Sequence, residues 1–293
     1  MKRIVATSTA RPEKLGALNI VRALPNSQTS GVGPIIFLDH ISETKLVAGQ
    51  MPPPNGSFAH PHKGIATFSY LLKGEVVHFD SNGGHGTVKA GGVQWMNAGN
   101  GIVHDEGMPK SLREQGGDFH AFQFWVNLPA KNKAEAPGYM PLQAEDLPVI
   151  PLDGDVGTLK VLLGEFAGRT SPIPAFTDQF IWHINLKPGA SLSLPTTDGN
   201  EYGGYLPEGR AVISQTEVAA REFFAFGSDD SGIVIHNPTS DAIDVMIFGG
   251  EPYREPVVSH GPFVMNTEDE IHQAYADFRA GKYGTIDYHG QSV

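Results

Sequence analysis

The chain has 293 residues, 40% of them hydrophobic, and a formal net charge of −11. This acidic balance, with no run of basic residues, argues against nucleic acid as a direct partner, because phosphate binding needs clustered Lys and Arg. The chain contains no cysteine, which excludes disulfides, thiolate metal sites and a cysteine nucleophile, so that any metal must be held by His, Asp, Glu or backbone oxygen.

The N-terminal residues are basic, but no long apolar run follows them, so they do not predict a signal peptide. No stretch of the sequence approaches the ~18 apolar residues that a membrane-spanning helix needs. We therefore expect a soluble cytoplasmic protein without a membrane partner.

Short runs of alternating apolar residues, separated by glycine-containing turns, dominate the first part of the chain. Gly74 joins two of these runs into a predicted hairpin, and Asn82-Gly83 predicts the next turn. The predicted strands are Ile35–Asp39, Ala66–Leu72, Glu75–Asp80, Gly86–Lys89, Val93–Asn97 and Phe119–Leu128.

The chain changes character at residues 131–150, which are rich in proline and poor in β-branched residues, and we interpret them as a linker. Predicted strands then resume at Leu159–Leu163, Phe180–Leu186, Gly204–Leu206, Ala211–Ile213, Gly232–His236 and Asp244–Phe248. One helix is predicted near the end, because Thr267 precedes three acidic residues and the apolar residues that follow share one face. Two β-rich halves of similar length predict an all-β protein with a pair of closed barrels, since closure removes exposed sheet edges.

Two short motifs carry candidate metal ligands. In His60-Pro61-His62 the two histidines point to the same side of an extended segment, and Pro61 favours that extended conformation. The same spacing in His104-Asp105-Glu106 places His104 and Glu106 on one side. Each motif alone is a weak signal, but their separation by a hairpin meander favours one shared site.

Three imidazoles and one carboxylate suit non-haem Fe(II), and Mn, Co, Ni, Cu or Zn are alternatives. The remaining histidines lack such a pattern. We expect His78 and His85 to face solvent near a hairpin, and His183 and His236 to lie in the second half without a neighbouring ligand pair.

Three segments resemble the pirin family: Phe58–Ile65, Gly92–Glu106 and Gly261–Thr267. The run Gly-Val-Gln-Trp-Met, followed by His and Glu, is highly specific for this family. The resemblance implies a bicupin, with two jelly-roll barrels and iron in the N-terminal one, held by His60, His62, His104 and Glu106. One departure is Ala66, where pirins commonly carry a glutamate.

The corresponding domain prediction places a metal-binding cupin barrel at residues 1–130 and a linker at residues 131–150. A second cupin barrel without metal, including the C-terminal helix, is expected at residues 151–293. We expect a monomer, because two fused barrels already satisfy the pairing that single cupins often achieve by dimerising.

The resemblance implies quercetin 2,3-dioxygenase activity, with a flavonol-like aromatic substrate and O₂ as reactants and carbon monoxide as a product. Glu106 is then the general base for the substrate hydroxyl. Aromatic and apolar side chains are candidates for a flat pocket, although barrel core is the simpler interpretation for most of them: Phe58, Trp95, Met96, Phe122 and Phe124.

Two alternatives remain open from the sequence. Pirins are also described as regulators, and the resemblance therefore also implies a protein that senses redox state through its iron and binds a transcription factor or a metabolic enzyme. A sugar isomerase-like cupin with Zn or Mn is the third hypothesis, which the specificity of the motifs disfavours.

Overall fold

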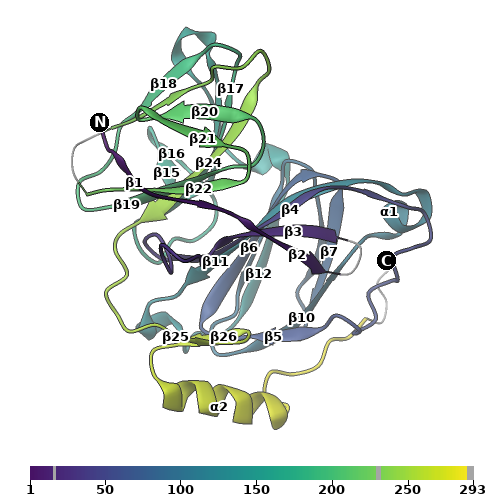
Figure 1. Ribbon diagram of the computed structural model, residues 1–293. Helices are drawn as coiled ribbons and strands as arrows, with labels where there is room; N and C mark the ends of the chain where they lie inside the picture. The colour runs from purple at the N-terminus through teal and green to yellow at the C-terminus, as the bar shows by residue number, and fades with distance from the viewer. Residues whose placement is uncertain (16–17, 229–231, 289–293) are drawn as a thin grey trace. The chain divides into compact units, whose positions relative to one another are not determined.

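The computed structural model describes residues 1–15, 18–228 and 232–288, and strands account for most of them (Figure 1). The chain divides into two compact units. We call residues 14–19, 41–146 and 254–293 the N-terminal barrel, and residues 1–13, 20–40 and 147–253 the C-terminal barrel. Among the described residues, no helix combines the length and the hydropathy needed to span a bilayer.

The N-terminal barrel contains a small antiparallel sheet with the order β5-β10-β7-β8. Its strands are β5 (His60–His62), β10 (Ile102–Gly107), β7 (Glu75–Asp80) and β8 (His85–Lys89). Both sequence motifs with candidate ligands therefore lie on neighbouring strands of one sheet.

A larger sheet has the order β12-β9-β6-β11-β4-β3-β2, and its strands β3 and β4 carry the chain between the two units. Its strands are β12 (Gly138–Leu142), β9 (Val93–Asn97), β6 (Ile65–Lys73), β11 (Gly117–Asn127), β4 (Ile35–Leu46), β3 (Leu18–Leu24) and β2 (Arg11–Leu15). Every strand predicted from the first part of the sequence is present here or in the small sheet.

The C-terminal barrel repeats this arrangement with sheets ordered β1-β22-β19-β24-β17-β14-β13 and β18-β23-β20-β21. The first contains β1 (Ile4–Thr9), β22 (Glu222–Phe226), β19 (Glu201–Leu206), β24 (Ile243–Gly250), β17 (Gln179–Leu186), β14 (Gly157–Leu163) and β13 (Val149–Pro151). The second contains β18 (Ser191–Leu194), β23 (Ile233–His236), β20 (Arg210–Ile213) and β21 (Thr216–Ala219). The all-β architecture with two barrels is thus confirmed.

The remaining elements are short. They are the hairpins β15 (Glu165–Phe166) with β16 (Arg169–Thr170) and β25 (Val258–His260) with β26 (Phe263–Met265), and the helices α1 (Lys110–Gln115), α2 (Glu268–Arg279), η1 (Ala130–Asn132), η2 (Ala144–Asp146) and η3 (Asp153–Asp155). Helix α2 begins as expected, because Thr267 and Glu270 form a reciprocal capping box. Helix α1 was not predicted, since it has six residues and none of them is buried.

The units depart from the predicted boundaries. Residues 1–13 and 20–40, which were predicted in the N-terminal barrel, belong to the C-terminal one. Residues 254–293 belong to the N-terminal barrel, where Phe263 bridges to Lys63 and Val264 N donates to the carbonyl oxygen of Lys63 at 3.1 Å. Phe263 and Tyr283 belong to an apolar cluster with Ile271 of α2, whose burial explains this placement. Residues 131–146, predicted as part of a linker between the barrels, also belong to the N-terminal barrel, where β12 pairs with β9.

Candidate metal centre

Strand register gathers the predicted ligands on one face of the small sheet. His60 of β5 lies directly opposite His104 of β10, and His62 lies opposite Ile102. On the other side of β10, Glu106 lies opposite His78 of β7. Directly opposed residues and residues two apart share a face of a sheet. All of these side chains therefore occupy the same face.

The structure brings three of the four predicted ligands into one group. One ring nitrogen each from His60, His62 and His104 lie within 4.8 Å of one another. Glu106 lies beside this group and forms a second group with His104 and His78 under the same limit. His104 thus links the imidazole cluster to the carboxylate.

Hydrogen bonds to backbone oxygen set the orientation of two imidazoles. Nδ1 of His60 donates to Phe58 O at 2.9 Å, and Nδ1 of His62 donates to Pro262 O at 3.2 Å. A neutral imidazole that donates from Nδ1 keeps a lone pair on Nε2. His62 Nε2 is buried and has no hydrogen-bond partner among the described residues. A buried Nε2 with a lone pair and no hydrogen-bond partner is suited to bind a metal ion. Histidines that bind metals also commonly donate a hydrogen bond from the other ring nitrogen to a backbone carbonyl, as His60 and His62 do here.

The distances within the cluster also suit a metal ion. The Nε2 atoms of His60 and His104 are 3.0 Å apart, and at this distance two imidazole nitrogens either share a proton or hold a cation. Two nitrogen ligands at roughly 2.1 Å from one ion and about 90° apart would be ~3.0 Å from each other. The donor set and its spacing therefore fit a divalent transition metal.

Burial keeps the two inner histidines neutral. It lowers the pKa of His62 to about 3, with the charge of His60 as the second cause. Burial, followed by His62, also lowers the pKa of His104 well below its ordinary value. Because only the neutral imidazole binds a metal, this electrostatic environment favours metal binding over protonation.

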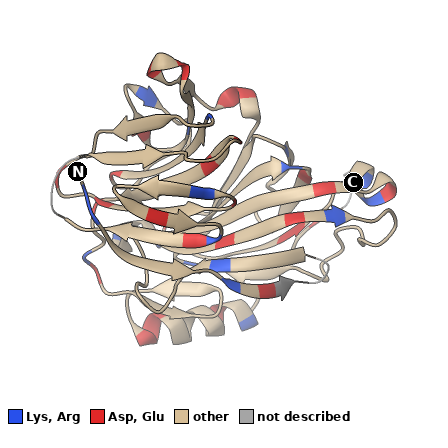
Figure 2. Ribbon diagram, turned by 45° about the horizontal axis from the view of Figure 1, so that its top comes forward, with Lys and Arg blue, Asp and Glu red and all other residues tan. Residues whose placement is uncertain are grey.

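Glu106 is half-buried at the edge of the cluster, and burial raises the pKa of its carboxyl group. Its Oε1 accepts a hydrogen bond from Nε2 of Gln94. Acidic and basic residues elsewhere are interspersed along the strands and loops (Figure 2). A carboxyl group with a raised pKa beside three histidines is therefore the distinctive electrostatic feature of this site.

The expectation that His78 faces solvent was wrong. His78 is 1% exposed, its Nε2 bonds Asp80 Oδ2 at 2.9 Å, and its ring stacks on Tyr139 with centroids 3.9 Å apart. Alternation along β7 does not single out this position, because Val77 and Phe79 on the other face of the strand are buried as well. His85, by contrast, is exposed as expected.

A cavity of about 370 Å³ opens next to the cluster. His60 and Glu106 line it, together with the polar side chains of Ser69, Gln94 and Gln123. The rest of its wall is mainly apolar and includes Leu18, Ile41, Met51, Pro52, Phe58, Leu71, Val76, Met108, Phe119 and Ala121. This volume is at the lower end of the roughly 300–1,000 Å³ range of small-molecule sites.

Of the candidate pocket residues, Phe58 alone lines the cavity, and it is 53% exposed. The other four are buried: Trp95, Met96, Phe122 and Phe124. Phe122 and Phe124 alternate along β11 with Gln123, which lines the cavity, so they point to the opposite face of the sheet. These four buried side chains therefore belong to the barrel core and not to the cavity wall.

Ala66, the departure from the family pattern, also points away from the cluster. It is fully buried on β6 and shares a face with Phe68, whereas Ser69 on the other face lines the cavity. The side chain at this position therefore lies on the face of β6 opposite to the one that lines the cavity.

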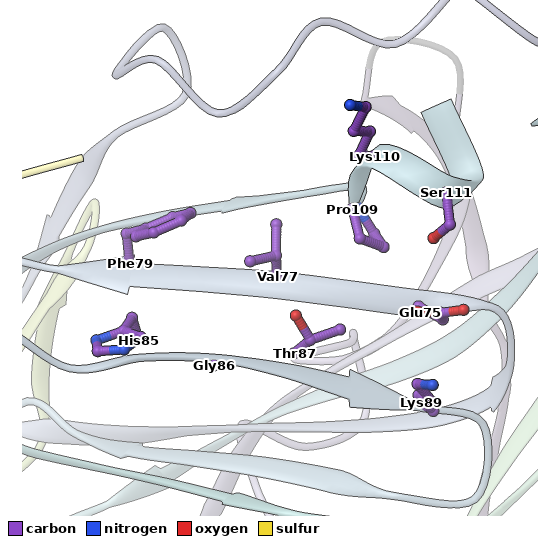
Figure 3. A pocket seen from close by; sticks show the side chains of 10 residues that line it. All are labelled: Glu75, Val77, Phe79, His85, Gly86, Thr87, Lys89, Pro109, Lys110 and Ser111. Atoms are coloured by element: carbon purple, nitrogen blue, oxygen red, sulfur yellow. The ribbon is translucent and has the colours of Figure 1, made fainter. Parts of the chain in front are cut away.

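A second cavity of about 370 Å³ lies against the other face of β7 and β8, next to α1 (Figure 3). It is lined by Glu75, Val77, Phe79, His85, Gly86, Thr87, Lys89, Pro109, Lys110 and Ser111. Val77 and Phe79 alternate with His78 along β7, so the sheet separates this cavity from the histidine cluster.

In the C-terminal barrel, β18 and β23 take the places that β5 and β10 hold in the small sheet of the N-terminal barrel. Their paired residues include Leu192 with Ile235 and Leu194 with Ile233. Leu194, Ile233 and Ile235 belong to the apolar core of this barrel. His183 instead bonds Asp244 Oδ1 at 2.8 Å. Apolar packing thus occupies the positions at which the N-terminal barrel has histidines.

The family model described as pirin matches residues 17–126, and the pirin C-terminal cupin domain matches residues 181–284. A pirin-like protein of Solanum lycopersicum is 34% identical over 97% of this chain and 92% of its own. Pirin of Homo sapiens is also 34% identical, over 94% of this chain and 91% of its own. The crystal structure of quercetin 2,3-dioxygenase from Acinetobacter baumannii is similar with a TM-score of 0.91 and 29% identity, covering 98% of this chain and 100% of that chain. The bicupin fold is confirmed.

Proposed function

The chain belongs to the pirin family, and we propose that it is an Fe(II)-dependent dioxygenase that opens the ring of a flavonol such as quercetin. One observation carries the proposal: His60 and Glu106 belong to the candidate metal centre and also line a largely apolar cavity. A substrate in that cavity would meet the metal and a carboxylate together.

In this proposal His60, His62, His104 and Glu106 hold the ion. Bound Fe(II) would supply a Lewis acid for the substrate hydroxyl group and a redox centre for O₂. Mn, Co, Ni, Cu or Zn could take the same ligands. Similarity to the Acinetobacter baumannii quercetin 2,3-dioxygenase supports this choice of chemistry.

The protein itself binds, orients and deprotonates the substrate. Apolar side chains such as Leu71 and Phe119 provide surface for a flat aromatic molecule, and Gln123 offers an amide for its hydroxyl groups. Glu106 takes the proton of the reactive hydroxyl as general base. Burial raises the pKa of its carboxyl group, which supports this role because a carboxylate with a raised pKa is a stronger base.

The overall reaction consumes one molecule of O₂ per flavonol and yields a ring-opened ester and carbon monoxide. The test is to load the metal-free protein with Fe(II) under anaerobic conditions, add quercetin, and then admit O₂. We expect loss of the flavonol absorbance with release of carbon monoxide, and neither in the His62→Ala protein.

Absence of turnover in protein that contains stoichiometric iron would overturn the dioxygenase proposal. That outcome would favour the regulatory alternative. The next measurement would then compare the proteins captured from a lysate by the Fe(II) and Fe(III) forms.

A further inference from the structure

Gln94 lies in the wall of the cavity and contacts the carboxylate of Glu106. Gln94 is 4% exposed, and its Nε2 donates to Glu106 Oε1 and lies 3.5 Å from Ser69 Oγ. All three residues line the same cavity. Gln94 belongs to the Gly-Val-Gln-Trp-Met run, and its side chain has no role in the proposed reaction itself.

Tyr139 determines which way the amide of Gln94 points. Its hydroxyl group donates to Gln94 Oε1 at 3.1 Å. Burial, followed by the charges of Glu106 and Asp80, raises the pKa of Tyr139, which keeps its hydroxyl group protonated as a donor. A flipped amide would lose this hydrogen bond and would also turn its oxygen toward the carboxylate. The hydroxyl group therefore selects the orientation in which Gln94 donates to Glu106.

Tyr139 is itself held in place by buried groups. Its ring stacks on His78 with an interplanar angle of 5°, and His78 Nε2 bonds Asp80 Oδ2 at 2.9 Å. The other oxygen of Asp80 accepts from the backbone nitrogens of Asn82 at 2.8 Å and Gly84 at 2.9 Å. This chain of contacts gives the tyrosine little freedom to move.

We propose that Tyr139 and Gln94 are positioning residues for Glu106: Tyr139 fixes the amide of Gln94, and Gln94 holds one carboxylate oxygen so that the other faces the ion and the substrate. This inference rests on the proposed function, because it takes Glu106 as a ligand of the ion. Support of this kind restricts a ligand to its productive orientation and strengthens metal binding.

The experiment is an anaerobic titration of metal-free protein with Co(II), followed by its visible absorption, for Gln94→Leu, Tyr139→Phe and the double variant. Gln94→Leu should weaken Co(II) binding by roughly 10–100-fold and change the absorption bands, and Tyr139→Phe by about tenfold. The double variant should bind no more weakly than Gln94→Leu alone, because Tyr139 acts through Gln94. Tyr139→Phe keeps the ring that stacks on His78.

Tyr205→Phe is the matched control. It removes the hydroxyl group of a buried tyrosine that lies 3.0 Å from His40 Nδ1 in the C-terminal barrel, so it should lower stability and leave Co(II) binding unchanged. Unchanged Co(II) affinity and absorption in Gln94→Leu and Tyr139→Phe, or additive losses in the double variant, would overturn this inference but not the proposed function. Failure of the unaltered protein to bind Co(II) would overturn the proposed function, and this inference with it.

Discussion

Nδ1 of His62 donates a hydrogen bond to the backbone oxygen of Pro262, 200 residues further along the chain, at 3.2 Å. This contact leaves Nε2 of His62 unprotonated and turned toward the other histidines. The C-terminal segment that precedes α2 thus sets the protonation of a proposed metal ligand in the N-terminal barrel.

Replacing His62 with Ala should abolish stoichiometric binding of iron, because it removes a buried proposed ligand whose ring nitrogen lies within 4.8 Å of those of His60 and His104. Loss of a direct ligand should lower metal affinity by more than the roughly 10–100-fold that loss of an outer hydrogen-bond partner causes. Metal analysis of the purified protein measures the loss, and circular dichroism checks the fold. His236→Ala, in the C-terminal barrel, is the control. Full metal content in His62→Ala would show that the ligand assignment is wrong.

Replacing Glu106 with Gln should keep the shape of the side chain and remove its capacity to accept the substrate proton. We expect kcat for quercetin to fall by about 10²–10⁴-fold, with a smaller loss of iron. Stopped-flow measurement on variants loaded to equal iron content separates the two effects. Turnover equal to that of the unaltered protein would remove Glu106 from the mechanism.

The metal-free protein should lose stability as the pH falls below about 6.5. Folding lowers the pKa of His62 to about 3, whereas an unfolded chain takes up this proton near pH 6.5. Between these values the unfolded state binds more protons than the folded state. The contribution of His62 to the free energy of unfolding is therefore fully present above pH 6.5 and is lost as the pH falls toward 3. One such group changes the free energy of unfolding by up to about 1.4 kcal/mol per pH unit.

Urea unfolding of the metal-free protein between pH 7.5 and pH 5 tests this dependence. His62→Gln has no titrating group at this position, and its free energy of unfolding should fall less steeply over the same range. Identical slopes for the two proteins would contradict the assignment of a buried, neutral His62.

Replacing Lys133 with Met should destabilise the N-terminal barrel. Lys133 is 3% exposed, and its Nζ donates to Gly64 O at 2.7 Å, Asn127 Oδ1 at 2.6 Å and Val264 O at 2.8 Å. Methionine fills a similar volume but leaves these buried acceptors without their charged donor. We expect a loss of about 2–4 kcal/mol in the free energy of unfolding, measured in urea.

Lys131→Met provides the comparison, because Lys131 is exposed and lies two positions away in η1. This change should alter the free energy of unfolding by less than about 0.5 kcal/mol. If both variants lose the same stability, the hydrogen bonds of Lys133 do not account for the effect.

The sequence by itself determined the features that depend on local periodicity. Alternation predicted β7 and β9 with their observed bounds, and Thr267 predicted the start of α2. The spacing in His60-Pro61-His62 and in His104-Asp105-Glu106 placed each pair on one side of its strand. These inferences were accessible because the direction of a side chain along a strand follows from the backbone alone.

Only the tertiary structure decided how these local pieces meet. Register placed His78 opposite Glu106 and brought Gln94 and Tyr139 to the same carboxylate. Packing of residues 254–288 within the N-terminal barrel brought Pro262 to His62. Such contacts depend on burial and strand pairing between segments far apart in the chain, and the local pattern of a single sequence does not encode the partner.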